Sequence, residues 1–103
     1  MLDFKDRLKK EYFELMSKYS KLISFIGALN ENGFTKQKIN SDKIPNNLAS
    51  LDIDKRIKYL DLLNSQAEYM KNYLRILVLR TELLGIELYD NSDFKKEYEI
   101  KFN

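Results

Sequence analysis

Apolar residues recur at helical spacing through the first third of the chain. They follow alternate steps of four and three residues: Leu8, Tyr12, Leu15, Tyr19, Leu22, Ile26 and Leu29. This spacing is the heptad seam of a helix that packs along one face. It predicts a helix over residues 3–30, about 40 Å long at ~1.5 Å per residue. Asn30, Asn32 and Gly33 tolerate a positive φ, and we expect them to end the helix.

A second heptad seam begins after the single proline of the chain. Residues 31–50 contain Pro45 and several residues that favour turns, so we expect a connector there. Ser50 or Asp52 can cap the helix that follows, which we predict over residues 51–89. Its seam repeats the same spacing: Ile53, Leu60, Leu63, Ala67, Met70, Leu74, Leu77, Thr81, Leu84 and Leu88. Two such helices predict an all-α, antiparallel two-helix coiled-coil hairpin forming a single domain over residues 1–103.

The antiparallel arrangement determines which levels of the two helices meet. We expect four sets of neighbours: Ile26 with Leu60, Tyr19 with Ala67, Tyr12 with Leu74, and Leu8 with Leu77 or Thr81.

A second stripe flanks the seam of the second helix. It contains Tyr59, Leu62, Gln66, Tyr69, Tyr73, Ile76, Arg80 and Leu83. A helix with two apolar flanks needs two neighbours, and the first helix supplies only one of them. The other neighbour is a second copy of the chain, the connector, the C-terminal arm or a ligand. We expect a homo-oligomeric helical bundle, and the alternative is a monomer whose own connector and arm cover the stripe.

Residues 90–103 leave the helical pattern and form a predicted C-terminal arm. Tyr98, Ile100 and Phe102 alternate there with charged residues, which is a weak signal for an extended strand. Such an arm either docks on a neighbour or is disordered.

The composition excludes several classes of site. The chain has no Cys and no His, which rules out disulfides, thiolate or histidine metal sites, and Cys or Ser/His nucleophiles. The acidic residues lack the pattern of a metal site in a helical bundle, and three isolated glycines form no phosphate loop. We therefore expect no enzyme activity, no metal and no cofactor.

Charge and hydropathy set expectations about partners. Eighteen Lys and Arg against sixteen Asp and Glu leave a net charge of +2, so nucleic-acid binding is not expected. The longest apolar run, residues 76–79, is far too short to cross a membrane, and the N-terminal residues do not resemble a signal peptide. We expect a cytoplasmic protein with no membrane partner.

Polar and aromatic residues on or beside the seams are candidate ligand contacts. We select Arg7, Tyr12, Lys18, Gln66, Tyr69, Tyr73 and Arg80. Arg and Lys bind phosphate, and tyrosine rings stack on nucleobases. Gln66, Tyr73 and Arg80 lie seven residues apart on one stripe, with about 10 Å between successive positions, which suits a nucleotide lying along a groove. Arg7 is expected near the level of Arg80, where it would complete an anion clamp.

The same residues also have a purely structural interpretation, which is the commoner outcome in proteins. Arg7 and Arg80 would then pair at helical spacing with one of three carboxylates, Glu11, Glu14 or Glu82. The tyrosines would pack at a boundary between subunits, where each hydroxyl finds a partner. The residue pattern leaves both interpretations open.

Both helices carry an extended residue pattern. It consists of Arg7-Leu8-x2-Glu11-Tyr12-x2-Leu15-x2-Lys18-x2-Lys21-Leu22-x2-Phe25-Ile26 and Leu62-Leu63-x2-Gln66-x3-Met70-x2-Tyr73-x3-Leu77-x2-Arg80. This pattern resembles a family of small helical phage proteins seen in crAss-like phages and in phages of low-GC bacteria. In size, hairpin form and phage setting, that family is similar to the phage anti-defence nucleotide sponges, the anti-CBASS and anti-Thoeris proteins.

The resemblance implies a phage-encoded, non-enzymatic anti-defence protein of the host bacterial cytoplasm. It would sequester a cyclic nucleotide or a cyclic ADP-ribose type immune signal. Two alternatives belong to other classes. One is an inhibitor or adaptor that docks its exposed apolar helix face on a host defence protein, and the other is a structural coiled-coil protein of the phage.

Overall fold

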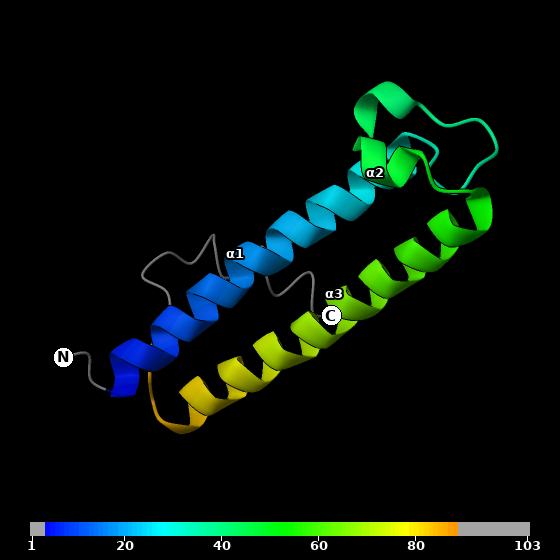
Figure 1. The fold of residues 1–103 in the computed structure, drawn as a ribbon. Coiled ribbons are helices and arrows are strands. Elements are labelled where there is room, and N and C mark those ends of the chain that lie inside the picture. Colours follow the sequence, from blue (N-terminus) through cyan, green and yellow to red (C-terminus); the bar gives the residue numbers. More distant parts are fainter. Residues whose placement is uncertain (1–3, 89–103) are drawn as a thin grey trace. The chain divides into compact units, whose positions relative to one another are not determined.

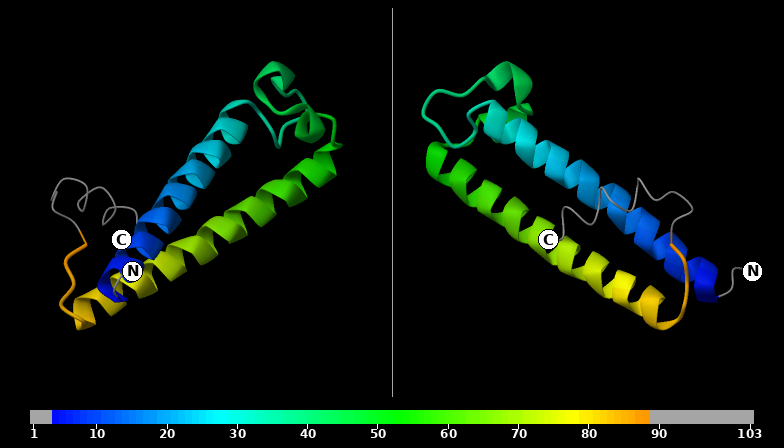
Figure 2. Two further views of the ribbon diagram at one scale, coloured as in Figure 1. Left: turned by 60° about the vertical axis from the view of Figure 1, so that its left-hand side comes forward. Right: turned by 180° about the vertical axis from the view of Figure 1, so that it is seen from behind.

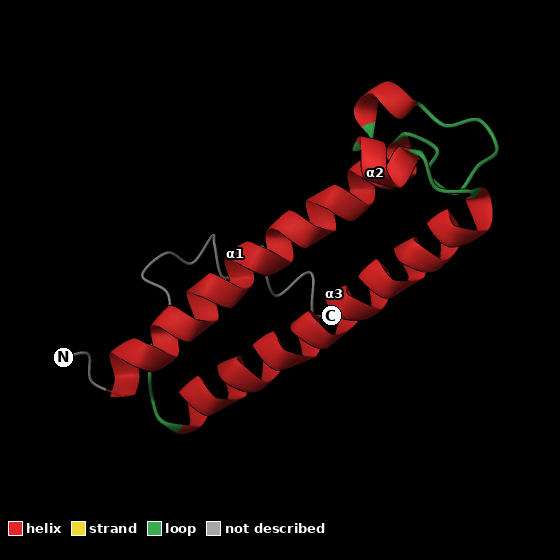
Figure 3. Cartoon of the chain, in the orientation of Figure 1, coloured by secondary structure: helices red, strands yellow, loops and turns green. Residues whose placement is uncertain are grey.

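The computed structural model describes residues 4–88, and these residues form helices joined by turns (Figure 1). Two long helices, α1 (Phe4–Glu31) and α3 (Ile53–Leu83), are joined by a connector. The connector contains the short 3-10 helix η1 (Ser41–Lys43) and the short helix α2 (Asn46–Ala49). Residues 4–88 contain no strand (Figure 3), which confirms the predicted all-α class for this part of the chain. The predicted C-terminal arm lies outside the described residues.

The chain divides into two compact units, and each long helix contributes to both. Residues 18–69 make one unit, which we call the connector unit. Residues 1–17 and 70–103 make the other, which we call the terminal unit and which is described over residues 4–17 and 70–88. Within each unit the segments of α1 and α3 run antiparallel (Figure 1). The assignment of residues 1–103 to a single domain stays a prediction.

The connector unit has an apolar core drawn from both helices and from the connector. Its buried apolar residues are Tyr19, Ile26, Leu29, Phe34, Ile44, Leu48, Leu60, Leu63 and Ala67. The Phe34 ring makes an edge-to-face contact with Tyr59, with ring centroids 6.4 Å apart. Two further views show the connector beside the end of α1 and the start of α3 (Figure 2). The connector therefore packs as part of the fold.

Tyr19 lies near the level of α3 that we predicted for it. Burial raises the pKa of the Tyr19 phenol, and the negative charge of Glu68 raises it further. Glu68 directly follows Ala67, which was the predicted neighbour of Tyr19. The two helices therefore meet at the expected level in this unit.

The terminal unit is centred on a second group of buried side chains. They are Leu8, Tyr12 and Met16 from α1, Leu74, Leu77 and Thr81 from α3, and Ile86 beyond it. The Thr81 hydroxyl donates a hydrogen bond of 2.7 Å to the Val78 carbonyl, so this buried polar group is satisfied. The Tyr73 hydroxyl donates to a carboxylate oxygen of Glu11. Glu11 precedes Tyr12, and Tyr73 precedes Leu74. This hydrogen bond therefore brings together the levels of α1 and α3 at which we predicted Tyr12 and Leu74 to be neighbours.

The long helices end in the same way, with a glycine in the left-handed region. Gly33 follows α1 with a φ of 72°, and Gly85 follows α3 with a φ of 65°. At the first end Phe34 N–H donates to Leu29 C=O, and at the second Ile86 N–H donates to Thr81 C=O. These are the bonds of a Schellman motif, which satisfies carbonyls at a helix end. No helix in the described part of the chain is long and apolar enough to cross a membrane.

The structure corrects the predicted end of the second helix. We predicted residues 51–89, but α3 ends at Leu83 because the chain turns through Gly85. Leu84, which we placed on the seam, is therefore exposed. The predicted cap is correct at Asp52, whose Oδ1 accepts the Lys55 N–H at 2.9 Å.

The seam of α1 also differs from the expected pattern. Met16 is buried, with 1% of its surface exposed, whereas Leu15 and Leu22 are only half-buried. Leu8, Tyr12 and Met16 follow steps of four, which also share one face of a helix, and all three are buried. Met16 therefore takes the core position that we assigned to Leu15.

Candidate ligand-binding site

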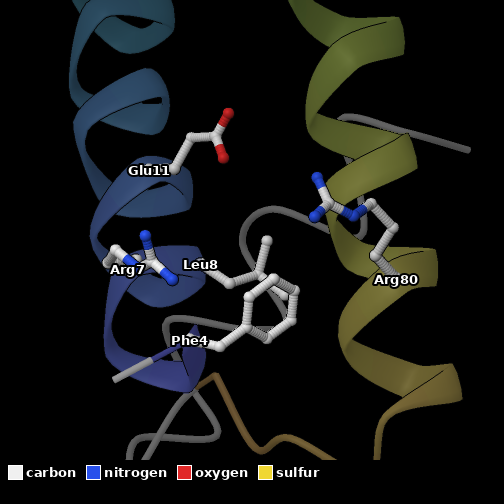
Figure 4. Close-up of a pocket in the computed structure, with 5 residues that line it drawn as sticks. All are labelled: Phe4, Arg7, Leu8, Glu11 and Arg80. Atoms are coloured by element: carbon white, nitrogen blue, oxygen red, sulfur yellow. The ribbon is translucent and has the colours of Figure 1, made fainter. Parts of the chain in front are cut away.

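A pocket in the terminal unit contains two of the predicted ligand residues. Phe4, Arg7, Leu8 and Glu11 from α1 line it together with Arg80 from α3. Its volume is about 280 Å³. Figure 4 shows Arg80 reaching from α3 toward the side chains of α1. Arg7 and Arg80, 73 positions apart in the sequence, thus share one site.

The helical repeat explains how α1 supplies four lining residues. Phe4, Leu8 and Glu11 follow steps of four and three, so they share a face. Leu8 is buried and forms the floor, while Phe4 is half exposed and forms an apolar wall. Arg7 precedes Leu8 and stands at the exposed edge of the seam. The lining therefore combines two apolar side chains with three charged ones.

The pocket carries more positive than negative charge. Two guanidinium groups, those of Arg7 and Arg80, face one carboxylate, that of Glu11. The Glu11 carboxylate already accepts the Tyr73 hydroxyl. Lys10 and Glu14 form an ion pair at 3.9 Å, and within residues 4–88 neither arginine of the pocket joins one. The arrangement leaves both guanidinium groups able to bind an oxyanion.

Tyr73 links the pocket to the neighbouring surface of α3. Its hydrogen bond to Glu11 raises the pKa of the Tyr73 phenol, and the Glu11 charge adds to the increase. The positive charge of Arg80 acts in the opposite direction. Tyr73 therefore stays protonated at neutral pH and acts as a donor to Glu11, with its ring half exposed beside the pocket.

The other predicted ligand residues lie elsewhere. Tyr12 is 0% exposed and belongs to the core of the terminal unit, so it offers no surface to a ligand in this chain. Lys18, Gln66 and Tyr69 belong to the connector unit, where all three are exposed. The structure thus brings together Arg7, Tyr73 and Arg80 from the predicted set.

Three lining residues were not among the predicted ligand contacts. Leu8 had been placed on the seam, Glu11 had been considered as an ion-pair partner, and Phe4 was not considered. A signal for Phe4 exists, because it lies one helical turn before Leu8 and extends the seam toward the N-terminus. The described residues hold no cluster of three or more acidic side chains that could bind a metal ion.

The second stripe of α3 is largely exposed in both units. In the terminal unit it exposes Tyr73, Ile76 and Leu83, with Leu83 at 88%. In the connector unit it exposes Leu62 and Tyr69, with Tyr69 at 76%. Within its own unit the connector therefore leaves Leu62 and Tyr69 uncovered. Such a row of large exposed apolar residues is typical of an interaction surface.

Comparison with known proteins gives one result. Residues 2–83 match the family model described as Sequestin. The match includes both long helices and the residues that line the pocket, and a family name of this kind denotes sequestration of a partner or ligand. Neither a curated protein nor a solved structure matches the chain.

Proposed function

The chain belongs to the Sequestin family, and from this premise we propose that it is a phage-encoded anti-defence protein that sequesters an anionic immune signal. The ligand class is a cyclic nucleotide or a cyclic ADP-ribose type signal. The protein acts as a stoichiometric binder and releases its ligand chemically unchanged. The family supports the sequestering role, and the pocket chemistry supports the choice of an anionic ligand.

The observation that carries this proposal is the pairing of Arg7 and Arg80 across one pocket. Guanidinium groups bind phosphate oxygens through charge-assisted hydrogen bonds, which are roughly twice as strong as neutral ones. The carboxylate that lines the pocket accepts the Tyr73 hydroxyl and pairs with neither arginine among residues 4–88, and two guanidinium groups against one carboxylate leave the lining with a net positive charge. A phosphate group of the ligand would bind between the two guanidinium groups.

The size of the pocket limits how much of the ligand it holds. Small-molecule sites have volumes of about 300–1,000 Å³, and this pocket has about 280 Å³. A phosphate with its ribose fits such a volume, whereas a whole cyclic dinucleotide does not. The remaining part of the ligand would lie over the exposed ring of Tyr73, where stacking on a base is worth about 1–3 kcal/mol.

The exposed stripe of α3 supports an assembly of several copies. Leu83, Ile76 and Leu79 together present a large apolar surface to water. Burial of such a surface contributes about 25 cal/mol per Å². We propose that a second copy of the chain covers it, which makes the protein a homo-oligomer. The same stripe favours the second candidate function, an adaptor that docks this face on a host defence protein.

Calorimetry against a ligand panel tests the proposed function. The panel contains cyclic dinucleotides, cyclic trinucleotides and cyclic ADP-ribose isomers. We expect binding of one of these classes, and we expect Arg80→Ala to weaken it by roughly 10- to 150-fold. That range corresponds to about 1.5–3 kcal/mol for a hydrogen bond to a charged group.

Arg75→Ala is the matched control for this experiment. Arg75 is an exposed arginine of α3 in the same unit and does not line the pocket. The Arg75→Ala variant should bind the ligand as tightly as the unchanged protein does. Absence of binding across the panel would favour the adaptor instead. Equal binding by Arg80→Ala and Arg75→Ala would show that the ligand does not bind in this pocket.

A further inference from the structure

Arg56 is a buried charged residue with unpartnered donors. Only 6% of its surface is exposed, and Arg56 and Thr81 are the two buried polar residues among those described. Thr81 bonds to a backbone carbonyl. By contrast, Nε and Nη1 of Arg56 are buried and have no hydrogen-bond partner among residues 4–88. A buried polar group left in this state needs a partner from outside the described residues.

The heptad seam of α3 explains why Arg56 is buried. It lies four residues before Leu60, which is followed on the same face by Leu63 and Ala67. All three of those residues are buried in the connector unit. Arg56 therefore occupies a core position, where its aliphatic stem is buried and two of its guanidinium nitrogens, Nε and Nη1, lose contact with water.

The carboxylate at ion-pair spacing before Arg56 does not compensate this charge. Asp52 lies four residues before Arg56, at a spacing suited to an ion pair. Its Oδ1 instead accepts the Lys55 N–H and caps α3. Among residues 4–88 no ion pair with Arg56 forms. A buried guanidinium group without a charged partner is costly to the fold.

From these contacts we infer that Arg56 is the buried cation of an anion site in the connector unit, where it binds a phosphate group that enters from solvent. A water molecule would supply an acceptor but no compensating charge. A phosphate group supplies both, and its several oxygens can serve more than one donor of the guanidinium group. Residues 18–69 also hold eight Lys and Arg against six Asp and Glu, which favours the approach of an anion.

This site is separate from the pocket of the proposed function and does not depend on it. The test therefore uses the full chain with Arg80→Ala as the parent, so that the pocket of the terminal unit contributes little. Inorganic phosphate is titrated at constant ionic strength and followed by calorimetry. Chloride and acetate are titrated in the same way. We expect saturable binding of one phosphate per chain, tighter than that of chloride or acetate.

The decisive variant is Arg56→Met in that parent, with Lys58→Met as its control. Methionine keeps the apolar stem and removes the charge, and Lys58 is an exposed cation one turn of helix or less away. We expect Arg56→Met to weaken phosphate binding at least tenfold and Lys58→Met to change it less than twofold. Phosphate should also raise the melting temperature of the parent and of Lys58→Met, but not that of Arg56→Met.

Arg56→Lys decides the question if Arg56→Met fails to fold, as judged by circular dichroism. It keeps the charge but loses the planar array of donors, so phosphate binding should weaken severalfold. The inference is overturned if Arg56→Met or Arg56→Lys binds phosphate as tightly as the parent. It is also overturned if the parent binds phosphate no more tightly than chloride. Equal binding of acetate would overturn the choice of phosphate and point to a carboxylate as the partner.

Discussion

Gly33 ends α1 in a backbone conformation that residues with a side chain rarely adopt. Its φ is 72°, and a Cβ atom added there would lie 3.1 Å from the backbone oxygen of Lys38. The left-handed conformation costs an ordinary residue about 1–2 kcal/mol. The close backbone oxygen adds to this cost because it cannot move aside as a flexible side chain would. Gly33→Ala should therefore lower the free energy of unfolding by more than about 2 kcal/mol.

The two other glycines separate the cost of the left-handed backbone conformation from the cost of the close backbone oxygen. Gly85 has a φ of 65° with no atom within 4 Å of its added Cβ, so Gly85→Ala should cost about 1–2 kcal/mol from the backbone alone. Gly27 lies inside α1, and a Cβ there meets nothing within 4 Å. Gly27→Ala should raise the stability by about 0.5–1 kcal/mol because alanine favours the helix.

Urea unfolding followed by circular dichroism measures these three differences. We expect the order Gly27→Ala, unchanged protein, Gly85→Ala and Gly33→Ala, from most to least stable. Melting temperatures should follow the same order, at about 4–8 °C per kcal/mol for a chain of this size. Equal stability of Gly33→Ala and Gly85→Ala would show that the close Lys38 carbonyl adds nothing to the cost of the Gly33 substitution. A Gly33→Ala protein as stable as the unchanged chain would refute the left-handed closure of α1.

Four further predictions concern the core, the pocket, the pH dependence of stability and the exposed stripe. Leu77→Ala should lower the free energy of unfolding by about 2.7–5 kcal/mol, because Leu77 is fully buried and alanine leaves a cavity; a loss below 1 kcal/mol in urea unfolding would contradict its place in the core. Glu11→Gln should lower the Tyr73 pKa toward its ordinary value near 10, measured by phenolate absorbance, because the Glu11 hydrogen bond raises it. Since the folded pKa values of Tyr19 and Tyr73 are both raised, their contribution to stability is present below about pH 10 and is lost as the pH rises through the folded values. Leu83→Gln should reduce the mass found by light scattering while helicity stays unchanged, and an unchanged mass would exclude this residue from the subunit interface.

The main features of the fold could be predicted because local rules and the apolar pattern agree. The residue steps predicted both long helices, and Asp52 was correctly named as a possible cap. The end of α3 was predicted too late because apolar residues continue past the turn at Gly85. Periodicity reports which face is buried, but the sign of φ at one glycine decides where the helix stops.

The candidate site was predictable only in part. The register of an antiparallel pair brought Arg7 to the level of Arg80, as expected. Tyr12 was selected for its ring, but its position on the seam places it in the core. Arg56 was not selected, because charged residues are rarely buried and it was not counted on the seam. Counting back four residues from Leu60 would have found it.

Depletion of a signal molecule from solution tests the central claim of sequestration most directly. The protein is mixed with a cyclic nucleotide or cyclic ADP-ribose isomer identified by calorimetry, and the free ligand is measured after ultrafiltration. The account predicts stoichiometric loss of free ligand, loss of that effect in Arg80→Ala, and full recovery of unmodified ligand after the protein is denatured. Ligand that stays free, or that returns chemically altered, would contradict it.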